Sequence, residues 1–312
     1  MKILITGGSG MVGKSISDEI KDSFKDHDFI FISSKEVNLY NINETIDMFE
    51  NIRPDCVIHL AAYVGGLFRN LNNKKDMFEK NVSINFNIVK CCYDYNVSKL
   101  IACLSTCVFP DKTEYPINED MLNNGPPHFS NDAYAYSKRM LEFHCKIYRE
   151  NYNKNFICVI PTNIYGEYDN FNLDNSHVIP ALIHNCFLSQ KNNSKFVIKG
   201  TGKPLRQFIY ARDLAKLILW CLFDYNENEN IILSVPEEDE IDIKYVGLKI
   251  SEIFKNKNEI VFDENFSDGQ YKKTADNSKL NRLNPDFKFT SIEVGLTNTI
   301  EWFKSNFDTL RK

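Results

Sequence analysis

The chain has 312 residues, of which 43% are hydrophobic and 25% are charged, and its formal net charge is -5. These values are ordinary for a globular protein with one large or two intimate domains, which can bury most of its apolar surface. The negative balance argues against nucleic acid and anionic membranes as partners, so local cations must bind any anionic ligand.

Signals for secretion, membrane insertion and metal binding are missing from the sequence. The run Met1–Gly7 becomes glycine-rich too early for a signal peptide, and no stretch approaches the ~20 apolar residues that a membrane helix needs. The 9 cysteines are odd in number and scattered, with neither a CxxC pair nor Cys/His metal spacing. We therefore expect reduced thiols in a cytoplasmic protein with no metal.

Short apolar runs alternate with longer helical patterns up to about residue 165. The apolar runs predict buried parallel strands at Lys2–Thr6, Phe29–Ser33, Cys56–Leu60, Leu100–Leu104 and Phe156–Pro161. The segments between them predict helices at Met11–Phe24, Asn43–Ile52, Asp76–Tyr95 and Ala133–Asn151. This alternation predicts an α/β protein with a Rossmann-type, doubly wound parallel sheet and right-handed crossovers.

The rhythm breaks after Gly166. Later segments predict a loop at Tyr168–Asn172, short strands at 195–199, 207–209, 231–235 and 259–262, and helices at Val178–Leu188, Asp213–Phe223, Ile243–Phe254 and near Ile292–Phe307. We expect a first domain over residues 1–165, completed by a returning segment at about 206–236. The remainder of 166–312 is expected to form a smaller α/β domain that shares a ligand cleft with the first.

A glycine-rich turn separates the first predicted strand from the first predicted helix and reads G-x-x-G-x-x-G. Glycine permits a tight turn and lets backbone N–H groups approach a pyrophosphate at the positive end of a helix. An ordinary glycine turn is the alternative, but the position after the first strand favours dinucleotide binding. The predicted binding residues are Gly7, Gly8, Ser9, Gly10, Met11, Val12 and Gly13.

The end of the second predicted strand selects the nicotinamide cofactor. An NAD enzyme usually has Asp or Glu there, which accepts from the ribose 2'-hydroxyl. Ser33, Ser34 and Lys35 stand there instead and would bind a 2'-phosphate, so NADPH is predicted, with Glu36 as the residue that favours NAD. Small residues close the third strand and suit packing on adenosine, although they also suit simple helix–sheet packing: Leu60, Ala61 and Ala62.

Tyr134 and Lys138 are four residues apart in a predicted helix, so they share one face. A phenol with an ordinary pKa near ~10 is a poor catalyst at neutral pH, and a neighbouring ammonium lowers that pKa. Tyr136 lacks such a partner, because Met140 stands four residues later. Ser105 follows the fourth strand, where its hydroxyl can polarise a carbonyl. The three residues predict the proton-delivery centre of a ketone reductase.

A thiol and an imidazole add chemistry that a ketone reductase does not need. Cys107 leaves the strand two positions after Ser105, and cationic neighbours can make a thiol with an ordinary pKa near ~8.5 a useful base. His177 stands at a loop–helix junction. The bland alternatives are a core cysteine and a capping histidine. The other cysteines, together with His59, His144 and His184, stand in strand or helix contexts and are expected to be structural.

A 4-keto sugar would use all five groups. Its hydrogens on carbons 3 and 5 are acidic, and removal of one gives an enolate whose oxygen Tyr134 and Ser105 can stabilise. Cys107 as base and His177 as acid would exchange protons on opposite faces. A hydride would then reduce the 4-ketone, and Tyr134 would supply its proton. We therefore hypothesise 3,5-epimerisation followed by 4-reduction.

At these residues the chain resembles the GDP-L-fucose synthase family, which are NADPH-dependent GDP-4-keto-6-deoxy-D-mannose 3,5-epimerase/4-reductases of the extended short-chain dehydrogenase/reductase group. The resemblance covers nearly the whole chain and is far more specific than the glycine turn. It rests on Ile5–Gly10 (ITGGSG), His59–Asn70 (HLAAYVGGLFRN), Leu104–Lys112 (LSTCVFPDK), Pro161–Gly166 (PTNIYG), Asp169–Asn172 (DNFN), Ser176–Pro180 (SHVIP), Arg206–Tyr210 (RQFIY) and Ser267–Gln270 (SDGQ).

The resemblance implies that Ser105, Tyr134 and Lys138 reduce the substrate, while Cys107 and His177 epimerise it. It implies a nicotinamide site lined by Lys138, His177, Pro161, Thr162, Asn163 and Ile164. Around GDP-4-keto-6-deoxy-D-mannose it places Asn163, Val178, Leu182, Arg206, Asp268 and Lys273, and the two cations would also suit a diphosphate on chemical grounds. At two further substrate positions, Asn185 and Lys199 depart from the arginine or lysine and the tryptophan usual in bacterial members. The family is homodimeric, which suggests pairing through the helices at 76–95 and 133–151.

Two other functions are compatible with parts of this sequence. An NAD-retaining nucleotide-sugar 4-epimerase or 4,6-dehydratase shares the fold. A dehydratase commonly shows Thr-Asp-Glu where this chain has Ser105-Thr106-Cys107, and the residues at 33–35 argue against NAD. A redox sensor that binds NADP without catalysis would leave the pair Tyr134 and Lys138 unexplained.

Overall fold

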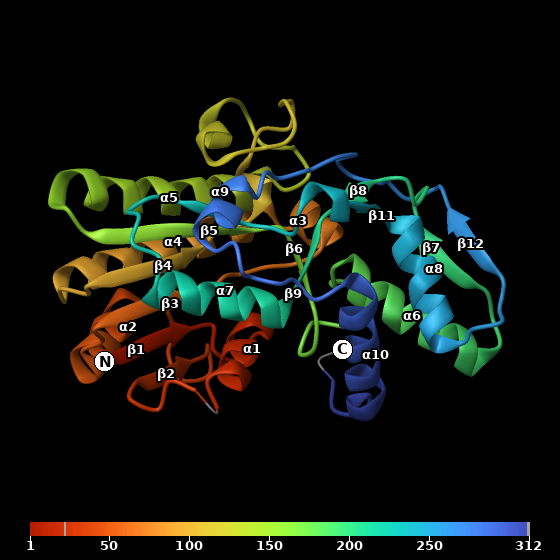
Figure 1. Cartoon of the computed structure of the whole chain (residues 1–312), viewed down its shortest axis with the longest axis horizontal. Coiled ribbons are helices and arrows are strands. Elements are labelled where there is room, and N and C mark those ends of the chain that lie inside the picture. The colour runs from red at the N-terminus through yellow and green to blue at the C-terminus, as the bar shows by residue number, and fades with distance from the viewer. Residues whose placement is uncertain (22, 311–312) are drawn as a thin grey trace.

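The main sheet of the computed structural model, which describes residues 1–21 and 23–310, has six parallel strands (Figure 1). Its order is β10-β5-β4-β3-β1-β2, so the chain steps to opposite sides of β1 when it forms β2 and β3. Loops that leave β1 and β3 therefore diverge at one sheet edge and create a crevice for a ligand. The strands are β1 (Lys2–Thr6), β2 (Asp28–Ile32), β3 (Cys56–His59), β4 (Lys99–Cys103), β5 (Asn155–Pro161) and β10 (Ile231–Leu233). The predicted fold class is confirmed.

Alternate residues of each strand enter two different cores, as expected for a parallel sheet that helices cover on both faces. Leu4 packs into one core with side chains of α2 (Ile42–Ile52), α4 (Lys74–Asp94) and α5 (Asp132–Tyr152). Ile3 and Ile5 pack into the other core with α1 (Met11–Glu19) and α7 (Ala211–Phe223). Both α7 and β10 come from the segment at about 206–236 that was expected to return to the sheet.

A third core lies at the other end of the molecule, at the right of Figure 1. Phe196, Val246 and Ile300 are buried there between helices and a short parallel strand pair. Its elements are α6 (Val178–Asn192), β7 (Phe196–Lys199), α8 (Ile243–Phe254), β12 (Ile260–Asp263) and α10 (Ile292–Asn306).

Short elements connect the two parts. Two strand pairs, β6 with β9 and β8 with β11, lie between the main sheet and the third core. The remaining elements are short helices and 3-10 turns, of which η1 is buried. Their bounds are β6 (Asn163–Tyr165), β8 (Leu205–Arg206), β9 (Phe208–Tyr210), β11 (Ile241–Asp242), α3 (Leu67–Asn72), α9 (Ser278–Leu283), η1 (Thr106–Val108), η2 (Glu119–Asn123) and η3 (Glu237–Asp239).

The first helix is shorter than predicted. It ends at Glu19, and Ile20 is its C-cap. Phe24 has a left-handed backbone with φ of 61° and stacks on Phe223 of α7, with 4.9 Å between ring centres. The prediction that the helix runs to Phe24 is wrong because this packing requires the chain to turn; Asp22 lies outside the described residues.

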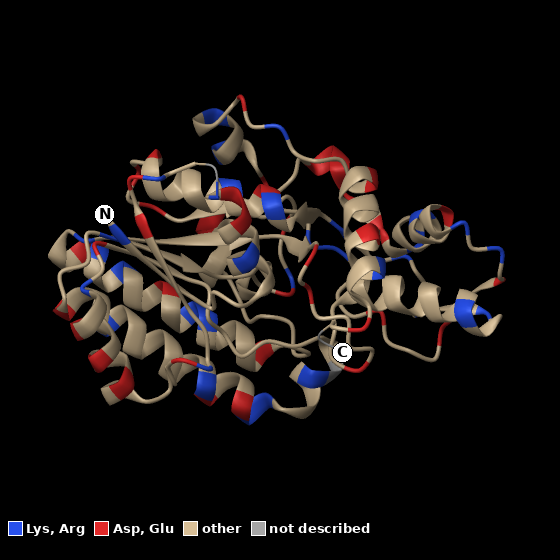
Figure 2. Cartoon of the chain, turned by 90° about the horizontal axis from the view of Figure 1, so that it is seen from below, with Lys and Arg blue, Asp and Glu red and all other residues tan. Residues whose placement is uncertain are grey.

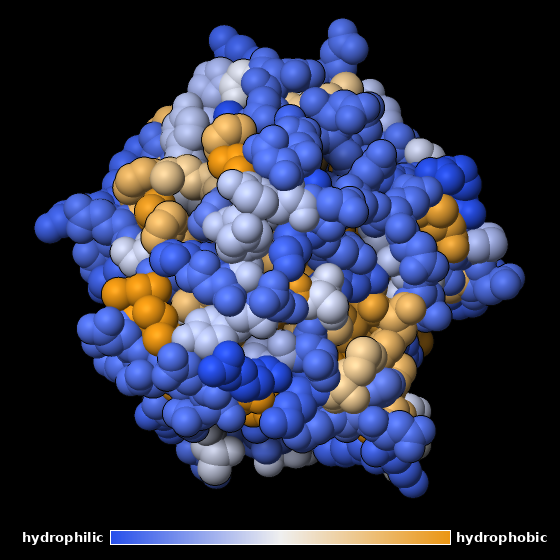
Figure 3. Space-filling model, turned by 90° about the vertical axis from the view of Figure 1, so that its left-hand side faces the viewer, coloured by the Kyte–Doolittle hydropathy of each residue, from blue (hydrophilic) through white to orange (hydrophobic). Residues whose placement is uncertain are grey.

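Charged and apolar side chains are mixed over the surface. In the view of Figure 2, basic and acidic residues are interspersed along the outer helices. The face in Figure 3 is mostly hydrophilic and carries several separate apolar patches. Among the described residues, no helix combines the length and the hydropathy needed to cross a bilayer.

Candidate active site

The glycine turn packs so tightly that larger residues would not fit. Gly7 has φ of 74°, and its carbonyl accepts from the N–H of Gly10 at 3.0 Å. A Cβ on Gly13 would lie 2.7 Å from the Gly7 oxygen, and one on Gly7 would lie 2.8 Å from the nitrogen of Ala61. The turn thus sits directly against the end of β3. The first turn of α1 contains no acidic residue, so its N–H groups fit a pyrophosphate.

The loop after β2 brings an acidic residue onto one of the predicted phosphate ligands. Glu36 accepts from the backbone N–H of Ser33 at 2.7 Å and also from its hydroxyl. These bonds from Ser33 lower the pKa of the Glu36 carboxyl. Ser34 and Lys35 remain exposed beside them. The loop therefore offers a cation and a hydroxyl for a 2'-phosphate, with a carboxylate that fixes Ser33.

Lys138 is almost fully buried and lies one helical turn from Tyr134 on α5. Its ammonium donates to the carbonyl of Cys103 at 2.7 Å and lies 5.8 Å from the centre of the Tyr134 ring. Burial raises the pKa of Tyr134 well above its usual value, and the nearby Cys107 and Cys103 thiols raise it further. The expectation that the pKa of Tyr134 lies below its ordinary value is wrong here, because burial outweighs the effect of the neighbouring ammonium. The phenol is protonated at neutral pH, which is the form that donates a proton.

Ser105 and Cys107 stand directly beyond the end of β4. Ser105 has an extended backbone and caps η1, where its hydroxyl oxygen faces the N–H of Cys107 at 3.5 Å. Burial raises the pKa of the Cys107 thiol, while Lys273, Ser105 and Lys138 act in the opposite direction. The structure therefore brings the serine, the thiol and the Tyr134–Lys138 pair together at the carboxyl ends of the parallel strands.

His177 is the N-cap residue of α6 and follows the loop that contacts Gly66. Its side chain is exposed, yet desolvation by surrounding protein atoms lowers the pKa of the imidazole. The preceding residues press on Gly66, whose N–H donates to the Asn175 carbonyl at 3.0 Å. A Cβ on Gly66 would meet the Ser176 oxygen at 2.5 Å. The imidazole forms no hydrogen bond with the part of the chain that the structure describes.

Arg206 makes contacts that sequence reasoning did not foresee. Its guanidinium donates to the backbone carbonyls of Leu205 at 2.6 Å, Gln270 at 2.6 Å and Tyr271 at 3.2 Å. Burial lowers its pKa. Arg206 thus fastens a segment of residues 267–276, which we call the strap, and a grip on a diphosphate would have to share this guanidinium with the strap.

The strap is also fastened to the chain that follows Cys107. The Tyr115 hydroxyl donates to the carbonyl of Lys272 at 2.7 Å, and the N–H of Ile117 donates to that of Thr274 at 2.8 Å. These bonds bracket Lys273 on both sides. Its ammonium is an electrostatic neighbour of Cys107, and burial lowers its pKa to about 8. Lys273 is therefore positioned beside the thiol.

The other predicted substrate residues line the second part of the molecule. The Asp268 carboxylate accepts from the Thr201 N–H and hydroxyl, both at 2.7 Å, which ties the strap to the turn after β7. The Lys199 ammonium lies 4.8 Å from the centre of the Phe266 ring. Val178, Leu182 and Asn185 follow one face of α6, with Leu182 buried and Val178 partly exposed.

The chain from Pro161 to Ile164 runs from the end of β5 into β6, at the same sheet edge as Ser105. The Asn163 side chain donates to the carbonyl of Gln207 at 3.0 Å. The buried Thr162 hydroxyl has no partner among the described residues. Gln207 was not predicted as a site residue: its amide donates to Ala275 and accepts from it at 2.7 Å, which anchors the end of the strap.

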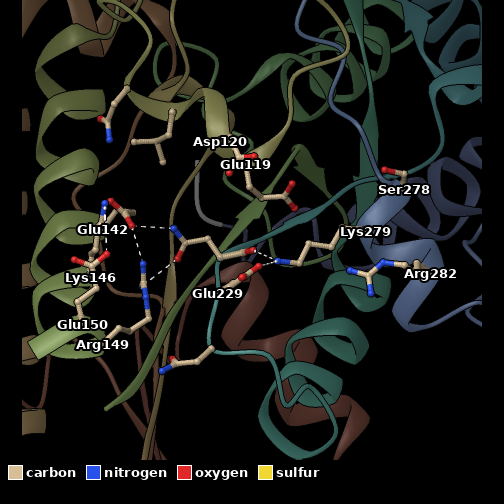
Figure 4. A pocket seen from close by; sticks show the side chains of 14 residues that line it. Glu119, Asp120, Glu142, Lys146, Arg149, Glu150, Glu229, Ser278, Lys279 and Arg282 are labelled. Carbon is tan, nitrogen blue, oxygen red and sulfur yellow. Dashed lines mark hydrogen bonds and ion pairs between the residues drawn. The ribbon is translucent and has the colours of Figure 1, made fainter. Parts of the chain in front are cut away.

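Two cavities lie outside this cluster. One of about 220 Å³ is lined by Ser9 of the glycine turn, Lys14 of α1, and Trp302 and Asn306 of α10. The larger, of about 770 Å³, lies between η2, α5 and α9 (Figure 4). Its cations are already paired with carboxylates, as Arg149 is with Glu142 at 3.0 Å. The larger cavity is therefore a groove whose charged side chains pair with one another, and it is not the site of the predicted chemistry.

Comparisons with known proteins agree with this geometry. Residues 3–235 match the family described as "NAD dependent epimerase/dehydratase family". The chain is 50% identical to GDP-L-fucose synthase of Dictyostelium discoideum over 99% of this chain and 97% of that protein. It is 43% identical to a probable GDP-L-fucose synthase of Drosophila melanogaster over 100% and 99%. A crystal structure of a GDP-L-fucose synthetase from Naegleria fowleri bound to NADP superposes with a TM-score of 0.94 at 48% identity, covering 100% of this chain and 95% of that one.

Proposed function

We infer, from the premise that this chain belongs to the NAD dependent epimerase/dehydratase family and within it to the GDP-L-fucose synthases, that it converts GDP-4-keto-6-deoxy-D-mannose to GDP-L-fucose with NADPH. One observation carries the proposal: a thiol stands beside a reductase pair, in a chain whose relatives of that name match it from end to end. The alternatives that retain NAD have no use for Cys107.

The residues divide the reaction between them. Ser105 and Tyr134 donate to the 4-keto oxygen, which carries negative charge each time carbon 3 or carbon 5 is deprotonated. Cys107 removes these protons, and His177 returns protons on the opposite face of the sugar. Bound NADPH supplies the hydride for the ketone. Tyr134 then gives its proton to the new alkoxide, while the buried Lys138 holds positive charge beside the phenol and stabilises the phenolate that forms.

The test follows proton exchange and reduction separately. Purified protein is incubated with the 4-keto sugar and NADPH or NADH in deuterated water, and the sugar formed is identified. We expect NADPH-preferring formation of GDP-L-fucose with deuterium at carbons 3 and 5. Cys107→Ser should suppress the deuterium uptake, and Cys221→Ser, which changes a buried free thiol on α7, is the matched control. Full uptake in Cys107→Ser would remove the base role, and no NADPH oxidation by the wild type would reject the function.

The charge of Lys273 should appear in the pH profile. Its pKa of about 8 means that the ammonium is lost as the pH rises through 8, and with it the attraction for the diphosphate. Since kcat/KM reports the free enzyme, it should fall above pH 8 by up to about tenfold per pH unit. Lys273→Arg should move this limb to higher pH, whereas Lys272→Arg should leave it in place. A wild-type profile that is flat to pH 9.5 would contradict this role.

We also propose that the chain forms a homodimer through α4 and α5. These helices pack side by side and present an apolar stripe, which we define as Phe78, Phe86, Tyr136, Met140 and Phe143. Phe143 is 61% exposed, which is unusual for a large apolar residue unless a partner covers it. Phe143→Glu should halve the mass measured by light scattering, while Leu248→Glu on α8 should not. A dimer that persists in Phe143→Glu would refute this interface.

We further infer a cytoplasmic location. All nine cysteines are free thiols, and eight of them are buried. Reduced cysteines at this density are typical of a compartment that keeps thiols reduced. A tagged chain found in a secretory compartment would overturn the inference.

A further inference from the structure

A buried series of hydrogen bonds, which we call the His59 network, joins Thr6, His59, Asn85 and Ser137. Thr6 Oγ1 lies 2.8 Å from His59 Nδ1, and His59 Nε2 lies 3.0 Å from Asn85 Oδ1. The Asn85 side-chain nitrogen then donates to the carbonyl of Ser137 at 3.3 Å. Thr6, His59 and Ser137 are fully buried, and Asn85 is 2% exposed. Four elements, β1, β3, α4 and α5, are thus joined through one imidazole.

The partners at both ends fix the direction of every bond. The Ser137 carbonyl can only accept, so Asn85 turns its nitrogen toward it and its oxygen toward His59. His59 Nε2 therefore carries the proton, and Nδ1 accepts from the Thr6 hydroxyl. The Thr6 oxygen in turn accepts from the N–H of Ala61 at 3.3 Å. Burial, and then the charge of Lys138, lower the pKa of His59 to about 3, which keeps this neutral form throughout the neutral range.

One end of the His59 network adjoins the predicted cofactor loop, and the other end adjoins the pair Tyr134 and Lys138. Thr6 directly precedes Gly7 of the glycine turn, and Ala61 follows β3 and packs against that turn. At the other end, Ser137 precedes Lys138, and its hydroxyl donates to the carbonyl of Tyr134 at 2.6 Å. Burying an imidazole is unfavourable unless both nitrogens are bonded, and here both are. The arrangement links the cofactor loops to the helix that delivers the proton.

We propose that His59 is a positioning residue, which holds the glycine turn and the first turns of α5 at one fixed separation. The proposal rests on the reaction inferred above for its second test, but its first test needs only NADPH. An error of about 1 Å between cofactor and proton donor is enough to slow such a reaction markedly. His59 itself touches neither substrate nor cofactor in this scheme and acts through Thr6 and Asn85.

Two near-isosteric variants break opposite halves of the chain, and a third serves as control. Thr6→Val removes the cofactor half, and Asn85→Leu removes the half that reaches α5. Asn87→Leu removes a buried amide from the same helix, but its bond runs to the carbonyl of Leu39 at 2.9 Å and not to α5. All three lose a buried hydrogen bond, so similar losses of stability are expected. Only Thr6→Val and Asn85→Leu interrupt the His59 network.

The first test measures amide hydrogen exchange over residues 132–138, with and without NADPH. In the wild type and in Asn87→Leu, NADPH should slow exchange in these first turns of α5. In Thr6→Val and Asn85→Leu this slowing should be lost, even when the cofactor saturates the protein. Equal protection in all four proteins would overturn the proposal, whatever the enzyme is found to catalyse.

The second test measures the kinetic isotope effect on turnover with NADPH deuterated at the transferred position. Misplacement of α5 should slow hydride transfer until it limits turnover, so the isotope effect on kcat should rise in Thr6→Val and in Asn85→Leu. It should not change in Asn87→Leu. Partial unfolding alone reduces the amount of active enzyme and leaves the isotope effect unaltered. An unchanged isotope effect in both Thr6→Val and Asn85→Leu would therefore reject the positioning role.

Discussion

Tyr134→Phe should lower the rate of 4-keto reduction by about 10²–10⁴-fold, which corresponds to about 3–5 kcal/mol of activation free energy. The phenol is protonated at neutral pH, and burial raises its pKa further, so the wild-type side chain is ready to donate. Phenylalanine keeps the ring beside Lys138 and removes only the hydroxyl. NADPH oxidation in a single turnover, followed by stopped-flow absorbance, measures the step directly.

Tyr136→Phe is the matched control for this experiment. Tyr136 lies on the same helix two residues away, is 44% exposed, and has Met140 rather than a lysine one turn later. Its variant should reduce the substrate at the wild-type rate. NADPH should bind both variants with nearly the wild-type dissociation constant, because the deleted oxygen serves the substrate. A Tyr134→Phe enzyme within tenfold of the wild type would show that another group donates the proton.

The predictable part of the fold was set by local sequence patterns. Buried apolar runs located all five N-terminal strands to within one or two residues. A strand that helices cover on both faces is apolar at nearly every position, so it stands out in the sequence. The strands β6, β8 and β11 were not predicted, and each has only two or three residues, whereas β9 was predicted at 207–209. Such strands exist because the fold brings two segments together, as at Arg206 and Ile241, and no periodic pattern encodes that meeting.

The candidate site divides in the same way. Spacing within one helix placed Tyr134 beside Lys138, and the end of β4 placed Ser105 and Cys107 together. The role of Arg206 was not predictable, because two of its bonds go to backbone carbonyls more than 60 residues away, and any residue type supplies a carbonyl. The direction of the Tyr134 pKa shift was also missed. Spacing reveals a neighbouring charge, whereas burial depends on the whole fold.

Arg149→Met should lower the free energy of unfolding by about 3–5 kcal/mol, the range found when one partner of a buried ion pair is removed. Arg149 pairs with Glu142 at 3.0 Å on α5, and their side chains are only 11% and 6% exposed. The same guanidinium donates to the Phe156 carbonyl at 2.9 Å and to Asn230 at 3.2 Å. It therefore ties α5 to β5 and to the chain entering β10. Urea denaturation, monitored by circular dichroism, measures the loss.

Lys146→Met provides the control, because Lys146 lines the same cavity from the same helix (Figure 4). Its pair with Glu150 is longer, at 3.7 Å, and its partners are 45% and 62% exposed, so the expected loss is about 0–1 kcal/mol. In the double variant Glu142→Leu/Arg149→Met, no unpaired charge remains buried, and much of the lost stability should return. Equal losses of unfolding free energy in Arg149→Met and Lys146→Met would mean that water reaches the Glu142 carboxylate, so that this ion pair is solvated rather than buried.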